Sequence, residues 1–167
     1  MTGRLARERV AVAQPHTRDL PGDFGHRRTI EVRFADTDAM GHVNNAIYLT
    51  YVETARVAYW AAVIDEPIER GPGRAESLIL AEAEIAFRSP VVHGETVVVE
   101  SRATGVGRTS LRLEHRLTAS RPGEPARLVA TCRTVIVRYD YVGERPVAFA
   151  PDIIARLEAF EGRPLRG

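Results

Sequence analysis

Hydrophobic and polar positions alternate with two different periods along the chain, and the periods separate predicted strands from predicted helices. Residues 29–35 (TIEVRFA) place Ile30, Val32 and Phe34 on one face between polar neighbours, the two-residue period of a half-buried strand. Four more strands are predicted at residues 78–88, 95–104, 111–117 and 128–138. In the first of these, one face carries Ile79, Ala81, Ala83, Ile85 and Phe87. Short turn-rich connections favour hairpins, so the sheet is expected to be largely antiparallel.

Residues 45–64 have the helical period instead. Apolar side chains recur there at helical spacing over much of the circumference, at Tyr48, Tyr51, Val52, Ala55, Ala58, Tyr59, Ala62 and Val63. Such a helix is expected to be wrapped by other elements rather than to lie on a surface. A short helix is predicted at residues 151–160, where Pro151 occupies the first turn.

The order of strand, long helix, four strands and short helix predicts an α+β fold with one antiparallel sheet curled around a central helix. In that arrangement the apolar face of the sheet and the helix bury each other. Residues 29–167 are expected to form this single domain. Residues 1–28 are rich in arginine, contain Pro and Gly and lack a sustained period, which predicts a flexible N-terminal extension.

Composition excludes several kinds of protein. Lys and Arg together number 23, and every one is Arg, so enzymes that need a Schiff-base or P-loop lysine are excluded. The single Cys132 cannot form an internal disulfide or a multi-cysteine zinc site, and its apolar neighbours predict a buried thiol. The formal charge of +1 argues against a nucleic-acid partner. Apolar stretches too short to span a bilayer and the lack of a signal-peptide core predict a cytoplasmic protein without a membrane partner.

Titratable and hydrogen-bonding groups gather in residues 36–45 (DTDAMGHVNN), between the first strand and the long helix. The first turn of a helix exposes unpaired backbone N–H groups and the positive end of the helix dipole, so it can hold an oxyanion. A carboxylate just upstream could attack a carbonyl bound there or activate water. The alternative is structural, since Asp and Asn are the usual residues that cap helices and close turns.

The runs RFADTDAMGHVNNAIYLTYVETAR, EIAFRSPVVHGETVVVE and GVGRTSLRLEH resemble the hotdog-fold acyl-CoA thioesterases of the 4-hydroxybenzoyl-CoA thioesterase family. The resemblance covers residues 29–140 and is most specific in the D-T-D-x-x-G-H-V-N-N-x-x-Y string. It implies a hotdog fold, hydrolysis of an acyl-CoA without metal or cofactor, and a homodimer or homotetramer. Hotdog subunits usually pair their sheets edge to edge and build active sites between subunits.

The resemblance also implies roles for individual residues. Asp38 would be the reactive carboxylate, as a nucleophile that forms a mixed anhydride or as a general base for water. The oxyanion donor would be a backbone N–H at or beside Asn45, and Gly41 would let the loop turn close to the substrate. Asn44 and Tyr48 are expected substrate contacts, although Tyr48 could instead pack in the core.

The sequence leaves the roles of two residues open. His42, four residues after Asp38, could form a base dyad with it or line the substrate pocket. Glu53 on the helix falls where another branch of hotdog thioesterases has its catalytic acid. Its offset from the loop matches the Asp38 type better, so a supporting or interface role is expected.

The segment GVGRTS (residues 105–110) is expected to connect two strands, which disfavours a phosphate loop because such loops lead into helices. As a hairpin it could offer Arg108, Thr109 and Ser110 to the phosphates of coenzyme A, or it could be an ordinary turn. Arg88 is a second candidate for the same task.

The function predicted from these residues is acyl-CoA thioester hydrolysis. Two alternatives remain: hydration or dehydration of an enoyl thioester, and a non-catalytic hotdog module that binds acyl-CoA.

Overall fold

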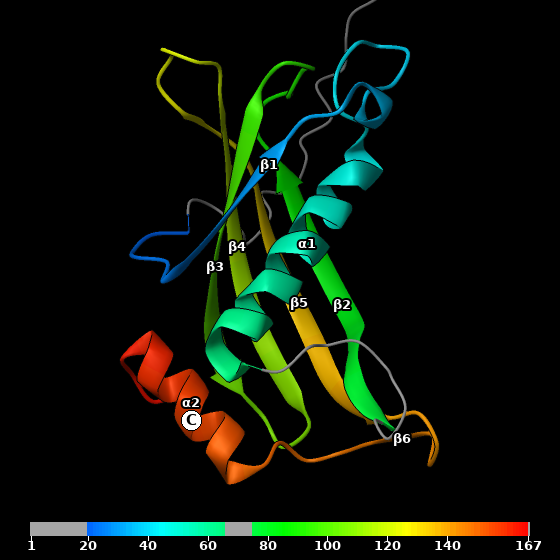
Figure 1. Ribbon diagram of the computed structural model, residues 1–167, viewed down its shortest axis with the longest axis vertical. Coiled ribbons are helices and arrows are strands. Elements are labelled where there is room, and N and C mark those ends of the chain that lie inside the picture. Colours follow the sequence, from blue (N-terminus) through cyan, green and yellow to red (C-terminus); the bar gives the residue numbers. More distant parts are fainter. Residues whose placement is uncertain (1–19, 66–74, 167) are drawn as a thin grey trace, which may run out of the picture.

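The structure, a computed structural model, describes residues 20–65 and 75–166. Its strands form a six-stranded antiparallel sheet in the order β1-β3-β4-β5-β2, with β6 paired to β5 (Figure 1). The strands are β1 (His26–Glu31), β2 (Glu76–Phe87), β3 (Thr96–Val106), β4 (Ser110–Ser120), β5 (Arg127–Asp140) and β6 (Arg145–Pro146). The helices are the 3-10 turn η1 (Phe34–Asp36), α1 (Asn45–Ile64) and α2 (Pro151–Glu161). The predicted α+β fold and the bounds of the long helix are confirmed.

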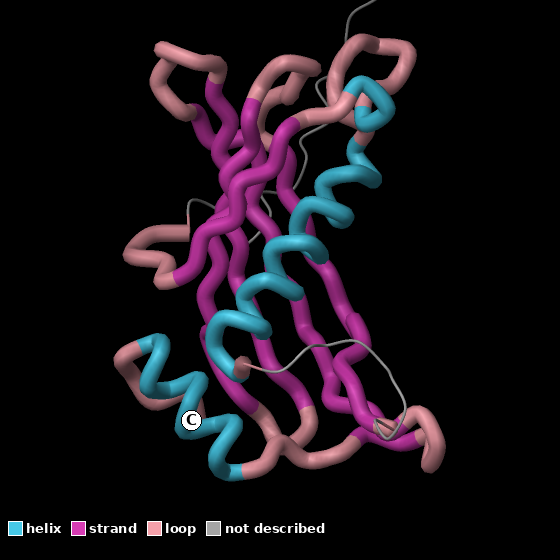
Figure 2. The backbone as a smooth tube through the Cα atoms, viewed as in Figure 1, coloured by secondary structure: helices cyan, strands magenta, loops and turns pink. Residues whose placement is uncertain are grey.

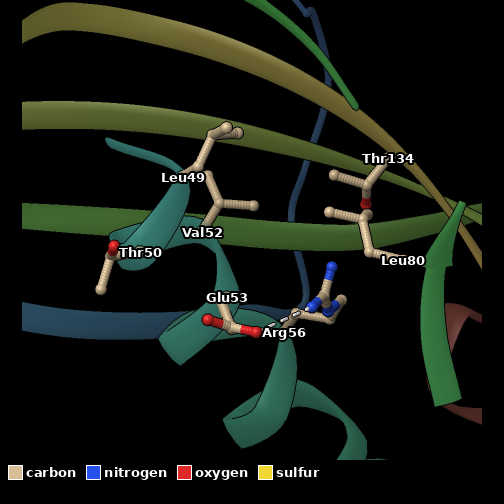
Figure 3. A pocket seen from close by; sticks show the side chains of 7 residues that line it. All are labelled: Leu49, Thr50, Val52, Glu53, Arg56, Leu80 and Thr134. Atoms are coloured by element: carbon tan, nitrogen blue, oxygen red, sulfur yellow. Dashed lines mark ion pairs between the residues drawn. The ribbon is translucent and has the colours of Figure 1, made fainter. Parts of the chain in front are cut away.

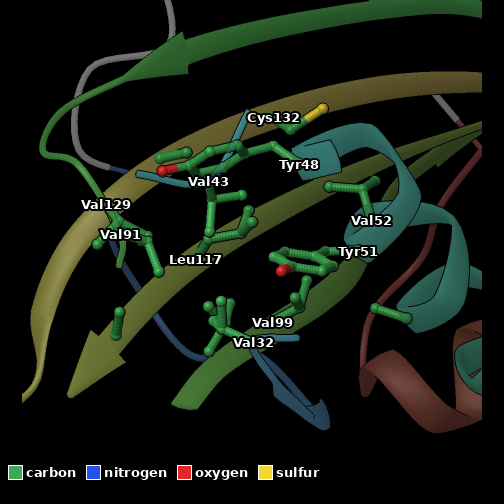
Figure 4. Close-up of a cluster of buried hydrophobic side chains, with 14 residues drawn as sticks. Val32, Val43, Tyr48, Tyr51, Val52, Val91, Val99, Leu117, Val129 and Cys132 are labelled. Atoms are coloured by element: carbon green, nitrogen blue, oxygen red, sulfur yellow. The ribbon is translucent and has the colours of Figure 1, made fainter. Parts of the chain in front are cut away.

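Helix α1 lies along one face of the curved sheet (Figure 2), and its two halves pack into two hydrophobic clusters. The cluster around the N-terminal half includes Tyr48, Tyr51, Val52, Val97, Val99, Leu117 and Val129 (Figure 4). The cluster around the C-terminal half includes Tyr59, Trp60, Ile64, Val106, Leu111, Leu113 and, from α2, Ile153, Ile154 and Leu157. The helix is therefore enclosed by the sheet and by α2, as its apolar circumference requires.

The first strand differs from the prediction at both ends. It begins at His26 and ends at Glu31, because the Asp36 carboxylate accepts a hydrogen bond from the Arg33 backbone N–H at 3.0 Å and turns the chain into η1. Phe34, predicted to be on the buried face, is consequently 79% exposed, whereas Val32 is buried as predicted.

The predicted N-terminal extension lies mostly outside the described residues, which begin at Leu20. The described part of it packs on the domain. Leu20 and Phe24 are buried, and the guanidinium groups of Arg102 and Arg116 lie 4.4 and 4.6 Å from the centroid of the Phe24 ring.

Strand β2 forms one edge of the sheet and does not keep the predicted alternation. A register shift between Leu80 and Glu82 reverses which residues face the helix. Leu80 therefore pairs with the buried Ile136 on the inner face, and Ile79 points to the other side. Ile79, Leu80 and Phe87 remain 41%, 42% and 43% exposed, so this edge strand presents large apolar side chains that no described residue covers.

Candidate active site

The loop between η1 and α1 is closed by its own backbone. An isolated bridge pairs Thr37 with Val43, and the Asp38 N–H donates to the His42 carbonyl at 3.0 Å. The Gly41 N–H donates to the Asp38 carbonyl, also at 3.0 Å. Gly41 has φ +81°, a left-handed conformation that favours glycine. The turn expected at Gly41 is therefore present, and it holds Asp38 beside His42.

The first acid of the D-T-D string is a structural group. Asp36 is 1% exposed, and its carboxylate accepts hydrogen bonds from the Arg33 guanidinium at 2.7 Å and from the Tyr51 hydroxyl at 2.8 Å. Burial raises the pKa of Asp36, but the hydrogen bonds from Arg33 and Tyr51 outweigh it and lower the pKa overall. Asp36 thereby ties the loop to α1.

The second acid is held at one oxygen only. Asp38 Oδ1 accepts a hydrogen bond from the Met40 N–H at 2.9 Å. Asp38 Oδ2 lies 3.9 Å from His42 Nδ1, too far for a hydrogen bond, and receives no hydrogen bond from any other described residue. The side chain is 20% exposed, so one carboxylate oxygen of Asp38 is available for chemistry.

The N-terminus of α1 leaves one backbone amide open. Asn44 is the N-cap: its Oδ1 accepts from the Ala46 N–H at 2.9 Å and its carbonyl from the Ile47 N–H, also at 2.9 Å. The Asn44 N–H itself donates to the Asp36 carbonyl. The Asn45 N–H has no hydrogen-bond partner within residues 20–65 and 75–166. The capping interpretation is thus confirmed for Asn44, while Asn45 presents a free donor at the positive end of the helix dipole.

A pocket of about 240 Å³ opens beside this amide. It is lined by His42, Val43, Asn45, Tyr48, Phe87, Arg88, Ser89 and Pro90. Three predicted site residues, His42, Asn45 and Tyr48, therefore meet in one place. Tyr48 is buried and packs edge-on against Phe87, with 5.1 Å between ring centroids.

Sequence reasoning missed most of the segment 87–90, because no period shows that the end of β2 returns to the start of α1. Arg88 is the one residue of this segment that the sequence predicts as a substrate contact.

The predicted phosphate contacts do not join this site within one chain. Arg108 and Thr109 lie in the β3–β4 turn and Ser110 begins β4; the Phe149 N–H donates to the Arg108 carbonyl. That turn follows Val106, which packs with the C-terminal half of α1. The loop at Asp38 lies at the opposite end of a 20-residue helix, about 30 Å long. Within one chain, residues 108–110 and the Asp38 loop therefore lie at opposite ends of α1.

Glu53 also lies apart from Asp38. It is two turns along α1, does not line the 240 Å³ pocket, and forms an ion pair with Arg56 at 3.5 Å.

Cys132 is fully buried, and burial raises its pKa to about 12, which confirms a core thiol. In the part of the chain that the structure describes, no three His, Cys, Asp or Glu side chains cluster to hold a metal ion. No described helix is long and apolar enough to cross a membrane.

Comparison with known proteins identifies relatives over most of the chain. The family model of the thioesterase-like superfamily matches residues 32–157. A thioesterase from Thermus thermophilus, solved with coenzyme A and zinc, is 38% identical, with a TM-score of 0.71 over 85% of this chain and 98% of that one.

Two curated relatives with thioester-hydrolase names are also similar. The 1,4-dihydroxy-2-naphthoyl-CoA hydrolase of Synechococcus elongatus is 32% identical over 114 residues, which are 68% of this chain and 79% of that enzyme. The acyl-acyl carrier protein thioesterase ATL3 of Arabidopsis thaliana is 30% identical over 104 residues, or 58% of this chain. The match spans 53% of ATL3, about half the length of that enzyme.

Proposed function

The chain belongs to the thioesterase-like superfamily, and we propose that it hydrolyses an acyl-CoA thioester to a carboxylic acid and free coenzyme A. One observation carries the proposal. The loop that leads to the free Asn45 amide also carries the open oxygen of Asp38. Asn45 and His42 line a pocket, and Asp38, which is not among its lining residues, lies beside His42 in the loop. A free donor and a free carboxylate are the two groups that a thioester carbonyl needs.

In the proposed reaction the thioester carbonyl oxygen accepts a hydrogen bond from the Asn45 N–H. The positive end of the helix dipole stabilises the negative charge that develops on that oxygen. Asp38 Oδ2 then either attacks the carbonyl carbon or removes a proton from an attacking water. In the first case the C–S bond breaks, coenzyme A leaves as a thiolate that takes up a proton, and water hydrolyses the mixed anhydride. His42 lines the pocket as a substrate contact.

The active unit is proposed to be a homodimer, alone or within a homotetramer. Strand β2 is 12 residues long, pairs with β5 on one side and exposes apolar side chains. A long apolar edge of this kind is a template for pairing with another chain. We therefore place the subunit contact along β2, so that the sheet continues into a second copy.

Antiparallel pairing about a two-fold axis brings opposite ends of the two subunits together. The β3–β4 turn of the second copy then lies at the same end as the Asp38 loop of the first. Arg108, Thr109 and Ser110 are proposed to meet the phosphates of coenzyme A across this axis, together with Arg88 at the pocket of the first copy. Arginine suits this task because its planar fork forms paired hydrogen bonds with phosphate.

The test is release of free thiol from a panel of acyl-CoA substrates by the purified protein. Saturable binding without thiol release would instead support the non-catalytic module, and a product that still carries the thioester would support the hydratase. Cytoplasmic location stays a prediction.

A further inference from the structure

A second, smaller pocket lies farther along the groove between α1 and β2 (Figure 3). Its volume is about 130 Å³, close to the roughly 150 Å³ of a cavity that holds a benzene ring. Its lining residues are Leu49, Thr50, Val52, Glu53 and Arg56 from α1, Leu80 from β2 and Thr134 from β5. The mechanism proposed above uses none of them.

Arg56 is the unusual member of this lining. The residue is 8% exposed, yet its guanidinium donates no hydrogen bond to any described residue. Its ion-pair partner is Glu53, at 3.5 Å, whose side chain is 65% exposed. The one fully enclosed side-chain nitrogen or oxygen without a partner in the described residues is His26 Nδ1. The unpartnered nitrogens of Arg56 therefore reach open space, and the pocket supplies it.

The charge of Arg56 is not balanced by the other groups that face it. Thr134 Oγ1 is 3.1 Å from His115 Nε2, and His115 Nδ1 is 2.9 Å from Ser101 Oγ, so this side of the pocket is neutral. Burial lowers the pKa of Arg56 more than Glu53 raises it. The partner of this buried guanidinium is exposed to solvent. A second anion that binds inside the pocket, where water is excluded, would therefore stabilise the guanidinium further.

The two pockets are joined by an apolar strip. Leu49 on α1 and Leu80 and Phe87 on the inner face of β2 are 38%, 42% and 43% exposed. From Asn45 to Arg56 the helix rises about 16 Å, and the arginine side chain leans back toward the N-terminus. That lean over the preceding turn takes up about 5 Å and leaves about 11 Å. An extended chain advances about 1.2 Å per bond, so about nine bonds, or ten carbons, connect the Asn45 amide to the Arg56 guanidinium.

We propose that the smaller pocket receives the far end of the acyl group and that Arg56 binds a carboxylate there. The favoured substrates are then ω-carboxyacyl thioesters of about ten carbons. This inference rests on the proposed thioesterase function and adds the substrate class. Arg56 is a specificity-determining residue that touches substrate at the end remote from the thioester.

The experiment compares kcat/KM for 9-carboxynonanoyl-CoA with kcat/KM for decanoyl-CoA. The wild-type protein should prefer the carboxylated substrate. Arg56→Gln should reduce the ratio roughly ten- to hundred-fold, the effect of losing a charge-assisted hydrogen bond. Arg56→Lys should restore part of the ratio, and Glu53→Gln should raise it because a competing carboxylate is removed. Arg112→Gln is the matched control, since Arg112 lies between the buried Leu111 and Leu113 and points to the other face of the sheet.

An equal or inverse preference in the wild type, or a ratio that Arg56→Gln leaves unchanged, overturns the inference. Hydrolysis of decanoyl-CoA would leave the proposed function intact in that case. If neither thioester nor any other acyl-CoA of the panel is hydrolysed, the proposed function fails, and calorimetric titration with decanedioate then tests whether the smaller pocket binds a carboxylate. Binding that is weaker in Arg56→Gln than in Arg112→Gln supports a carboxylate site at Arg56, and equal binding by the two folded variants overturns it.

Discussion

The hydroxyl of Tyr51 donates a hydrogen bond of 2.8 Å to the carboxylate of Asp36, and this contact fixes the loop that starts at Asp36 to the helix that follows it. Two residues later, Asp38 keeps one carboxylate oxygen without a hydrogen-bond donor in the described chain. The two acids of one short motif therefore have different tasks. One holds the loop in place, and the other is the proposed reactive carboxylate.

Replacing Tyr51 by Phe should lower the free energy of unfolding by about 1–3 kcal/mol, because the buried Asp36 carboxylate loses a donor. Urea denaturation of the variant measures the loss. Tyr139→Phe is the control, since no described residue is hydrogen-bonded to the Tyr139 hydroxyl, and it should change stability by less than about 0.5 kcal/mol. Equal effects of the two substitutions would show that the contact to Asp36 contributes nothing.

Protonation of His115 should make the protein sensitive to acid. Burial, with Arg56 and His26 nearby, lowers the pKa of His115 from 6.5 to about 3. At a pH between these two pKa values, His115 is protonated in the unfolded chain but not in the folded chain. The free energy of unfolding therefore falls as the pH drops. One such group contributes at most about 1.4 kcal/mol per pH unit.

Chemical denaturation from about pH 7 to about pH 4.5 should therefore show a steep loss of stability in the wild type. In His115→Gln the slope should be shallower by about 1 kcal/mol per pH unit. The slope is the readout, because the substitution also changes stability at neutral pH. Parallel slopes would mean that His115 is not the group that titrates.

A charge on the exposed edge of β2 should separate the subunits. Ile79→Arg introduces a cation where we place the subunit contact, and charged edge residues oppose strand pairing. Light scattering during size exclusion should give a dimer or tetramer for the wild type and a monomer for the variant. Val142→Arg, at a position that is 80% exposed in the turn after β5, should leave the mass unchanged. An unaltered mass for Ile79→Arg would locate the interface elsewhere.

Arg108→Ala should weaken the binding of coenzyme A and not the binding of the acyl arm. KM should rise for an acyl-CoA, and it should stay constant for the matching acyl-pantetheine, which lacks the nucleotide phosphates. A rise for both substrates would point to a disturbed fold. No rise for either would remove the β3–β4 turn from the site.

The hydrophobic periodicity of the sequence predicts the helices and strands but not the irregularities within them. Helix α1 has the predicted bounds because twenty residues of continuous helical pattern leave little freedom at either end. The register shift at Leu80 in β2 carries no such signal, and it reverses the face predicted for Ile79. Phe34 was misplaced for a related reason, since the turn there depends on contacts of the Asp36 side chain.

The sequence does not predict those residues of the candidate site that reach it only through the tertiary fold. The motif predicts a candidate site at Asp38 and the helix start, because both lie within one short segment. The meeting of that segment with residues 87–90 depends on strand order, which alternation does not specify. Arg56 falls among the polar positions of α1, and its burial follows from how the helix lies over the sheet.

The most direct test of the proposed mechanism is the turnover of Asp38→Asn measured by thiol release from an acyl-CoA that the wild type hydrolyses. The variant keeps an oxygen for the Met40 N–H and loses the reactive carboxylate, so it should fold normally and lose about 10²- to 10⁴-fold in kcat. Asp152→Asn, in the first turn of α2, should retain wild-type turnover. A folded Asp38→Asn protein with undiminished turnover would contradict the account.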